Sequence, residues 1–565
     1  MAPVSKTLHG RSRRASQALM LLAMAITIAA PRYLSLGKYV TIDEHTWLTQ
    51  SANFAAALHR RDFAATFQIE HPGVTTMWLG ALAQRLIYPD YVREHPKPID
   101  RASYEATLRE KLGSPLPMLV MSRALVTGVI TLCFLLSFVM LRILIGTRSA
   151  MLGMLFVALD PFAVAHTQLL HVDGLLSSFV LVGLLSLLAY LHNHRPAFLI
   201  LSGVAGGLAF LTKSTSLLAL PGAIMIVFIN QLIHREGTIR ERLKWAVWQS
   251  RILVVCMLIA IITIFAVWPA LWTSPSLTLN RVINGAIHYA QTGHEHPVFY
   301  RGQIIPTGRI GLSFYPLAYL WRSTPTALIG IVLALSSAIL GYPAPMASKR
   351  REYLVYFVLM ASLFLSALSF GYKKFDRYML PAWFPLLIAS GLGWDALVAW
   401  LHHRSLSWRR RYLIQLTLAC GILLHGVEAT RVFPYPLSYY SPLLGGGNRA
   451  AQVFTVGWGE GLSDAAAYLN GLPHPEDTEV TTWYLSCFSY YYAGHSYEIP
   501  NAIEIDPAHL DALLEKDYVV TYINQWQRQI PPALFERLSE WCLIHTITLN
   551  DIEYVHIYSR EHCNQ

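Results

Sequence analysis

Long apolar runs separated by short polar segments fill the first three quarters of the chain. Most runs approach twenty residues, the length that crosses a bilayer as an α-helix. They are continuous rather than alternating, which favours helices over a β-barrel. We place about eleven spans at residues 17–37, 118–144, 150–165, 174–191, 197–211, 217–233, 252–271, a run ending before residue 349, 353–370, 379–401 and 412–427.

Two segments depart from this pattern. Residues 38–117 form a long loop, in which 47–58 has one apolar helical side and 74–87 is too short to span, so both are expected in the membrane interface. Ordinary polarity returns after residue 430, where strand-like runs alternate with a helical pattern across 479–484, 506–514, 518–523 and 544–548. We therefore predict an all-α polytopic membrane domain (1–430) followed by a small external α/β domain (431–565).

Composition agrees with a membrane protein. The 565 residues are 54% hydrophobic and 14% charged, and a soluble protein carries nearly twice that charged fraction. The net charge of +10 raises nucleic acid as a partner. However, the basic residues lie in short loops, and the chain lacks the basic and aromatic groove that single strands require, so we expect no nucleic acid.

The basic loops also predict orientation. Alternate loops carry clusters of arginine and lysine, and such loops stay in the cytoplasm. The clusters are Arg11, Arg13, Arg14; Arg142, Arg148; Arg195; Arg235, Arg240, Arg242, Lys244; Lys349, Arg350, Arg351; and Arg409, Arg410, Arg411. We therefore expect a multi-pass protein of the plasma (inner) membrane with a cytoplasmic N-terminus and an uncleaved first span. The first long loop, the histidine-rich loop at about 272–315 and the C-terminal domain then lie outside.

Four cations break this orientation pattern on the outer side: Lys213, Lys373, Lys374 and Arg377. Cations are disfavoured on the translocated side of a membrane. A bound anion, such as the phosphate of a lipid carrier, would explain them, because arginine and lysine both bind phosphate. The alternative is that they reach out to Asp376 and to lipid headgroups.

An acidic pair, Asp43 and Glu44, follows the first span on the same outer side. A carboxylate placed there can serve as general base toward a hydroxyl. Alternatively, Asp43 caps a helix that begins near His45, with Glu44 in its first turn. Capping would leave the external cations unexplained, so we favour Asp43 as the base, with Glu44 as a second catalytic candidate, its support or the cap.

Further polar residues at the outer edge are candidates for a substrate pocket: His45, Glu70, His71, His171, Asp173 and Tyr378. Glu70 and His71 suit a metal, a donor phosphate or a turn before the helix at 74–87. His171 and Asp173, with His166, lack the dense ligand spacing of a zinc site. A divalent metal ion is therefore left open.

The external domain holds three cysteines, Cys487, Cys542 and Cys563. Disulfides are permitted outside the cell, but an odd number allows at most one bridge there. The spacing does not select the pair.

These features together resemble the GT-C glycosyltransferases, especially the protein O-mannosyltransferases (family 39) and the lipid A aminoarabinose transferases. The stretches that carry the resemblance are Ile42-Asp43-Glu44-His45, Glu70-His71-Pro72-Gly73-Val74, His171-Val172-Asp173 and Lys374-Phe375-Asp376-Arg377-Tyr378-Met379-Leu380-Pro381. Their order along the chain is more specific than any one of them. The resemblance covers most of the membrane part, and the tail is similar to the smaller external domain of bacterial relatives.

The resemblance implies transfer of a sugar, with inversion, from a polyprenyl phosphate to an acceptor hydroxyl on the extracytoplasmic side. Asp43 matches the first-loop acid regarded as the catalytic base, and Glu44 matches its neighbour. His71 stands where a relative has a phosphate-binding lysine. Lys373, Lys374 and Arg377, with Lys213, then take the phosphate role. The partners implied are membrane lipids, the lipid-linked sugar and a lipid, glycan or protein acceptor.

Two other classes of function compete with this one. A transporter or flippase of lipid-linked sugars would place charges at mid-membrane and show inverted repeats, whereas the charges here gather at the outer edge. A receptor or assembly scaffold would depend on the external domain and tolerate changes at Asp43 and Glu44.

Overall fold

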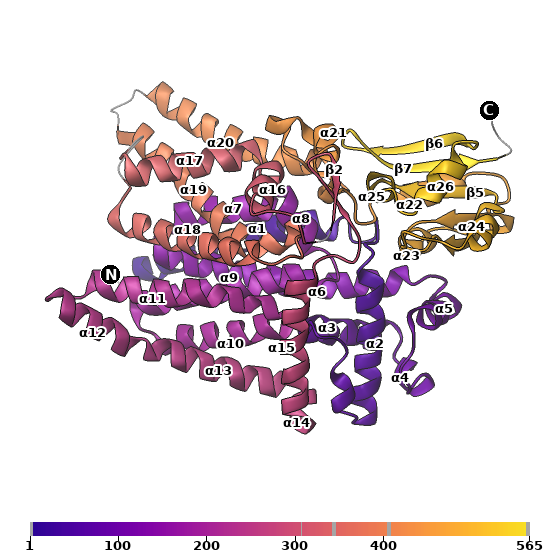
Figure 1. The fold of residues 1–565 in the computed structure, drawn as a ribbon. Coiled ribbons are helices and arrows are strands. Elements are labelled where there is room, and N and C mark those ends of the chain that lie inside the picture. Colours follow the sequence, from indigo (N-terminus) through magenta and orange to yellow (C-terminus); the bar gives the residue numbers. More distant parts are fainter. Residues whose placement is uncertain (1–3, 307, 342–345, 404–407, 561–565) are drawn as a thin grey trace.

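The computed structural model describes residues 4–306, 308–341, 346–403 and 408–560 (Figure 1). Most of it is a bundle of apolar helices, with a small mixed sheet at one end. Seven of the described helices or helix pairs are long and apolar enough to cross a membrane: Arg14–Tyr33, Leu116–Ile145, Val172–Asn193, Ser214–His234, Ile239–Val267, Ser348–Ser369 and Asp376–Leu401. The chain is therefore a multi-pass membrane protein.

Two further spans are bent. Helix α7 (Thr147–Leu159) turns by 65° into α8 (Pro161–Thr167), and α16 (Phe314–Arg322) turns by 114° into α17 (Pro325–Ile339). They raise the count over the described residues to as many as nine. The predicted count of eleven is not confirmed. The other two predicted spans fall on α10 (Pro196–Thr212), which has 17 residues, and on α20 (Trp408–Arg431).

Helix α9 (Val172–Asn193) forms the centre of the bundle and is almost wholly buried. It packs against α6 (Leu116–Ile145), α10 and α19 (Leu380–His403). Glycines let α19 approach its neighbours closely. A Cβ at Gly391 would lie 2.4 Å from the Gly153 nitrogen of α7, and one at Gly393 would lie 1.9 Å from the Gly330 oxygen of α17. The remaining bundle helices are α1 (Val4–Tyr33), α11 (Leu220–His234), α12 (Ile239–Gln249), α13 (Arg251–Val267) and α18 (Ser348–Ser369).

The first long loop is helical. Its elements are α2 (Glu44–Arg60), η1 (Ala64–Thr66), α3 (Val74–Ile87), α4 (Tyr91–Glu94) and α5 (Arg101–Leu112). Both helices predicted for this loop, at 47–58 and 74–87, are therefore confirmed as helices. Helix α2 runs across the direction of α9, as does α15 (Pro275–Thr292) of the histidine-rich loop at about 272–315 (Figure 1).

The histidine-rich loop at about 272–315 continues past α15. It contains α14 (Ala270–Thr273) before that helix and an antiparallel hairpin of β1 (Val298–Tyr300) and β2 (Gln303–Ile305) after it. Tyr300 of β1 also pairs with Phe454, which joins this loop to the C-terminal region.

The C-terminal region carries a five-stranded sheet in the order β4-β3-β5-β7-β6. The strands are β3 (Glu479–Thr482), β4 (His495–Glu498), β5 (Tyr518–Tyr522), β6 (Cys542–Leu549) and β7 (Ile552–Ser559). Strand β3 is parallel to β4 and β5, whereas β7 is antiparallel to β5 and β6. The predicted small α/β region is confirmed, although β4 and β7 were not predicted.

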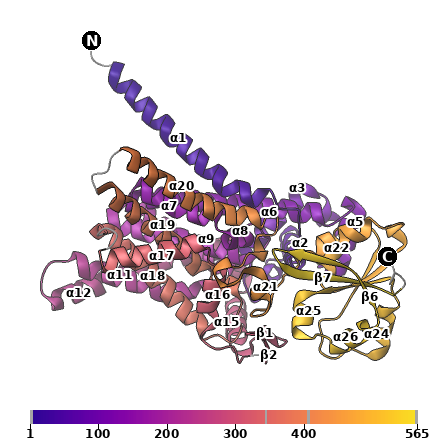
Figure 2. The same ribbon diagram turned by 90° about the horizontal axis from the view of Figure 1, so that it is seen from above.

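Short helices surround the sheet and connect it to the bundle. They are α21 (Gly446–Ala451), α22 (Leu462–Asn470), α23 (Leu485–Ser489), α24 (Pro507–Leu514), α25 (Ile523–Arg528) and α26 (Pro532–Leu538), with turns η2 (Ser214–Ala219), η3 (Asp376–Met379), η4 (Pro436–Ser438), η5 (Pro442–Leu444) and η6 (Pro475–Asp477). Figure 2 shows this region beside α2, α5 and α6, while α1 leads away toward the N-terminus. Cys542 is in a disulfide bond, Cys487 is a buried free thiol, and Cys563 lies outside the described residues.

Candidate functional site

Asp43 lies at the N-terminus of α2, and its carboxylate is free of the helix. Its side chain makes no capping hydrogen bond. Instead, Oδ2 lies 3.4 Å from Nε2 of His171 and 3.2 Å from a guanidinium nitrogen of Arg377. The side chain remains 37% exposed. Asp43 therefore begins the helix with its backbone while its carboxylate faces a histidine and an arginine.

His171 contacts both acids of the cluster. Its Nδ1 accepts a hydrogen bond from the backbone N–H of Asp173 at 3.3 Å and lies 3.4 Å from Oδ2 of that residue. With Nδ1 as the acceptor, the ring N–H on Nε2 donates to Asp43. Burial alone would raise the pKa of Asp43. The hydrogen bond from His171 and the charge of Arg377 outweigh burial and hold that pKa well below its usual range. Asp43 is thus ionised at neutral pH.

A second acid, Asp173, links two of the predicted cations. Its Oδ1 lies 2.7 Å from Nζ of Lys213, and its Oδ2 lies 3.4 Å from Nε of Arg377. Arg377 therefore bridges Asp43 and Asp173. Nζ of Lys213 also lies 4.0 Å from the ring centre of Tyr378. The fold has brought together predicted residues from distant parts of the chain: Asp43, His171, Asp173, Lys213, Arg377 and Tyr378.

A cavity of about 370 Å³ opens beside this cluster. Three chain regions line it: ends of the bundle helices, the loop at about 272–315 through His294, Glu295 and His296, and the C-terminal region. Residues of the predicted site in its wall are Asp43, Lys373, Lys374 and Arg377. The size and the mixture of apolar walls with a few charged groups are typical of small-molecule sites.

The two lysines in this wall differ. Nζ of Lys374 donates to the carbonyl of Ser369 at the end of α18, so that lysine is held by backbone. Nζ of Lys373 lies 4.9 Å from the ring centre of Tyr289. Burial lowers the pKa of both, and Arg377 adds to the effect at Lys373. Lys373 and Arg377 are therefore the better placed cations for an anion in the cavity.

Glu44 does not reach the cavity. Its carboxylate is fully buried, forms an ion pair with Arg123, with one contact at 2.7 Å, and accepts hydrogen bonds from the Thr41 N–H at 2.9 Å and the Leu170 N–H at 2.8 Å. The Thr41 hydroxyl adds another at 2.9 Å. These contacts use the oxygens that catalysis would need, so the structure makes Glu44 a positioning residue rather than a catalytic one.

None of the six predicted pocket residues lines the cavity. Three of them, His171, Asp173 and Tyr378, belong to the cluster beside it, and the other three have contacts of their own. His71 stacks on Tyr289 with ring centres 4.2 Å apart, and burial together with the charges of Lys213 and Lys373 lowers its pKa to about 3. Glu70 packs against Gly285 of α15. A Cβ added at Gly285 would lie 2.3 Å from the Cβ of Glu70. His45 contacts Arg101 at 3.4 Å, and burial and that charge lower its pKa to about 4.

Trp458 completes the cluster, and the sequence analysis missed it. Its ring centre lies 4.3 Å from the Arg377 guanidinium carbon and 5.0 Å from the His171 ring centre. Its carbonyl accepts a 3.1 Å hydrogen bond from Ile42, next to Asp43. The feature of the sequence that marks this position is the glycine on each side of Trp458, at 457 and 459. A Cβ at Gly459, where φ is +129°, would lie 2.1 Å from the Val40 oxygen.

Two buried arginines were also missed. Arg123 of α6 holds Glu44, and Arg322 of α16 forms a 2.8 Å ion pair with Asp376. Arg322 donates further to the carbonyls of Leu437 and Tyr439, which fastens the bundle to the segment after it. Each interrupts an apolar run, and a charge in such a run is a functional or structural signal in its own right.

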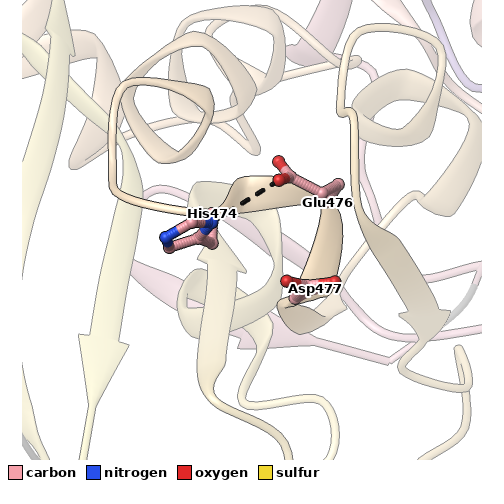
Figure 3. A group of neighbouring side chains, drawn as sticks. All are labelled: His474, Glu476 and Asp477. Carbon is pink, nitrogen blue, oxygen red and sulfur yellow. Dashed lines mark ion pairs between the residues drawn. The ribbon is translucent and has the colours of Figure 1, made fainter.

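One group in the described part of the chain has ligand atoms close enough to hold a metal ion: His474, Glu476 and Asp477 (Figure 3). All three are exposed, and an ion pair of 3.7 Å joins His474 to Glu476. None of them lines the cavity. Exposed acidic groups need no metal, so this group gives no support for a metal at the site.

Residues 118–268 match the family model described as "Dolichyl-phosphate-mannose-protein mannosyltransferase". No curated protein matches the chain. The resemblance to the protein O-mannosyltransferases inferred from the sequence is therefore confirmed over this part of the chain.

Particular solved structures can be named. The chain aligns with apo ArnT from Cupriavidus metallidurans at 13% identity and a TM-score of 0.50, over 96% of this chain and 98% of that one. ArnT from Cupriavidus metallidurans bound to undecaprenyl phosphate aligns at 11% identity and a TM-score of 0.49, over 97% of this chain and 98% of that one. The oligosaccharyltransferase AglB from Archaeoglobus fulgidus, in complex with an inhibitory peptide and a dolichol-phosphate, aligns at 12% identity and a TM-score of 0.49. The alignment covers 91% of this chain and 70% of that one. The first of these likenesses shows the shared fold.

Proposed function

We propose that this protein transfers a sugar from a polyprenyl-phosphate donor to an acceptor hydroxyl, with inversion and on the extracytoplasmic side. The observation that supports this most is that Asp43, whose side chain is 37% exposed, shares a cavity wall with Arg377 and Lys373. A displacement at a phosphate-linked sugar needs a base on one side and cations on the other. The family match over residues 118–268, described by a dolichyl-phosphate-linked sugar, supports a lipid phosphate as the leaving group.

In the proposed reaction, Asp43 removes the proton of the acceptor hydroxyl while the hydroxyl oxygen bonds to the anomeric carbon. The bond from that carbon to the phosphate oxygen breaks, and the lipid phosphate leaves with the electron pair. Arg377 and Lys373, with Lys213 behind them, stabilise the departing charge. Attack opposite the leaving group inverts the anomeric centre.

The Asp43–Arg377 contact implies an order of events. In the free protein, Arg377 and His171 keep the pKa of Asp43 low, which makes it a weak base. A donor phosphodiester carries one negative charge, as Asp43 does, and competes for Arg377 because it can bind the guanidinium through two oxygens whereas Asp43 uses one. Donor binding then loosens the Asp43–Arg377 pair and raises the basicity of Asp43 when it is needed.

The decisive variant is Asp43→Asn. We expect transfer to fall by about 10²–10⁴-fold, the usual contribution of a general base. Affinity for undecaprenyl phosphate should stay the same or increase, since Arg377 loses its 3.2 Å partner. Transfer is measured by mass spectrometry of envelope glycans and lipids in cells that express each variant, and affinity by titration of the purified protein.

Asp62→Asn is the matched control, because Asp62 is 50% exposed in a 3.7 Å pair away from the cavity. Near-normal product formation in Asp43→Asn would overturn the proposed role of Asp43. Movement of lipid-linked sugar across proteoliposomes without any covalent product would instead favour a transporter or flippase.

A further inference from the structure

The C-terminal wall of the cavity carries a cation without an acidic partner. Arg528, at the end of α25, lines the cavity from the C-terminal region. Its Nε donates to the carbonyl of Asn524 at 2.8 Å. Within the described residues, no carboxylate lies within ion-pairing distance of its guanidinium. Most other arginines of the cluster, such as Arg322 and Arg377, are paired with aspartates.

An unpaired arginine in a half-buried wall needs a reason. Removing a charge from water without a counter-ion is unfavourable, and burial lowers the pKa of Arg528 accordingly. The guanidinium stays charged at any physiological pH, so it retains free N–H donors on its terminal nitrogens. The group best matched to those donors is an oxyanion.

A second observation points to a ligand at the same place. Asn524 is 3% exposed and lines the cavity, and its Oδ1 is buried without a hydrogen-bond partner. Its Nδ2 is occupied by the Tyr484 hydroxyl at 2.6 Å and the Gly457 carbonyl at 3.2 Å, which fixes the direction of the amide. Buried acceptors of this kind are normally satisfied, so Oδ1 suits a ligand hydroxyl.

The position relative to the reacting groups also fits. Gly457, which Asn524 holds, is followed by Trp458, whose ring contacts both Arg377 and His171. Arg528 and Asn524 therefore lie in the same cavity as Asp43 but on the wall that the C-terminal region supplies. The donor phosphate already has Arg377, Lys373 and Lys213 on the bundle side.

We propose that Arg528 and Asn524 form an acceptor subsite, and that the acceptor carries an oxyanion, such as a phosphate, next to a free hydroxyl. Arg528 binds the oxyanion and Asn524 Oδ1 accepts from a hydroxyl. This inference rests on the proposed transferase function and adds the chemical class of the acceptor. A sugar phosphate and an anionic phospholipid headgroup both provide this chemistry.

The test uses the full-length protein in detergent, saturated with undecaprenyl phosphate so that the donor side is occupied. The probes are glucose 1-phosphate, its neutral counterpart glucose, and dihexanoyl phosphatidylglycerol. We expect at least one anionic probe to bind about tenfold or more tightly than glucose, the size of one charged hydrogen bond. The tighter of the two anionic probes distinguishes a soluble source from a lipid source.

The variant Arg528→Gln should lose about tenfold in affinity for the anionic probe and keep its affinity for undecaprenyl phosphate. Arg528→Lys keeps the charge without the planar fork, should fall between the two, and serves if the glutamine variant fails to fold. The control is Arg537→Gln, since Arg537 is 56% exposed and paired with Asp511 at 3.1 Å. It should bind like the parent.

Equal binding of glucose and the anionic probes, or unchanged anionic binding in Arg528→Gln, would overturn the subsite. A loss of undecaprenyl phosphate affinity in Arg528→Gln would also overturn it, because it would assign Arg528 to the donor. Failure of the proposed function gives a different result: Arg528-dependent probe binding in a protein that forms no glycosylated product.

Discussion

The chemistry of Asp43 is set by the groups around it more than by its own side chain. One oxygen accepts from His171 and faces Arg377, and both contacts favour the carboxylate over the acid. The backbone N–H of Asp173 fixes the ring of His171. Asp43, His171 and Arg377 therefore act as a unit. His171 orients the carboxylate of Asp43, and Arg377 restrains it.

This arrangement predicts a pH dependence. A depressed pKa keeps Asp43 ionised as pH falls through the ordinary carboxyl range, so the acid limb of kcat/KM lies below that range in the parent. His171→Phe removes a hydrogen bond to the ionised form, which raises the pKa of Asp43. We expect the acid limb to move to higher pH by about one unit, the equivalent of one hydrogen bond.

The measurement is kcat/KM against pH for the parent and for His171→Phe. His474→Phe is the control, since His474 is exposed and does not line the cavity. An acid limb at the same pH in parent and variant would show that His171 does not tune Asp43.

The sequence identified the charged members of the site because charges at the ends of apolar runs are conspicuous. Asp43, Asp173, Lys213 and Arg377 stand out for this reason. It favoured Asp43 over Glu44 as the base but kept Glu44 as a second candidate, because consecutive residues at a helix start project in different directions, and only the packing decides which faces a cavity. Trp458 and Arg528 lie in a segment of ordinary polarity, where one aromatic or basic residue carries little signal.

At the scale of elements, Glu44 and Arg123 fasten α2 to the bundle. The pair is fully buried, and Glu44 also accepts from Leu170 just before α9. The start of α2, the N-terminal part of α6 and the entry to α9 are thereby fixed relative to one another. Asp43 and His171 stand on two of these three elements, so their alignment depends on this pair.

Glu44→Ala should therefore destabilise the protein severely. Removing one partner leaves Arg123 charged and buried, which costs about 3–5 kcal/mol. The measurement is the thermal unfolding midpoint in detergent. Glu94→Ala is the control, because Glu94 and Lys111 are each 42% exposed at 3.3 Å, and such a pair contributes at most about 1 kcal/mol. Equal midpoints for the two variants would contradict the role given to Glu44.

The elements that sequence periodicity predicts well are those with unbroken patterns, such as α3 and β5. Two bends inside apolar runs, each predicted as one straight span, were not foreseen. Asp160 before Pro161 and Thr324 before Pro325 each cap the following helix with their side chains. A proline starts a helix readily but prevents continuation of the previous one, so each run becomes two helices at an angle. Hydrophobicity alone does not register such a bend.

At the scale of the whole molecule, the site joins two regions that the sequence separates. We retain a boundary near residue 430 as a proposal for the end of the membrane domain. The cavity uses residues from both sides of it, with Asp43 and Arg377 from one and Trp458 and Arg528 from the other. The C-terminal region therefore contributes directly to the wall of the cavity beside Asp43 and Arg377.

Trp458→Ala tests this dependence. The ring contacts the guanidinium of Arg377, an interaction of about 0.5–2 kcal/mol, and it also limits the movement of His171. We expect turnover to fall about tenfold or more while the unfolding midpoint changes little. Product formation is compared with that of Trp248→Ala, whose side chain is 49% exposed on α12. Equal turnover in both variants would show that the C-terminal wall is dispensable.

Trp458 follows the whole helical bundle in the sequence, and this position has a consequence for biosynthesis. Every bundle helix, and with them the acid, the histidine and the arginine, is translated before this residue. A nascent polypeptide thus holds the reactive residues for some time without the wall that packs against Arg377 and His171. We expect chains ending before residue 457 to insert and yet form no glycosylated product, so that premature termination yields an inert protein rather than an unregulated one.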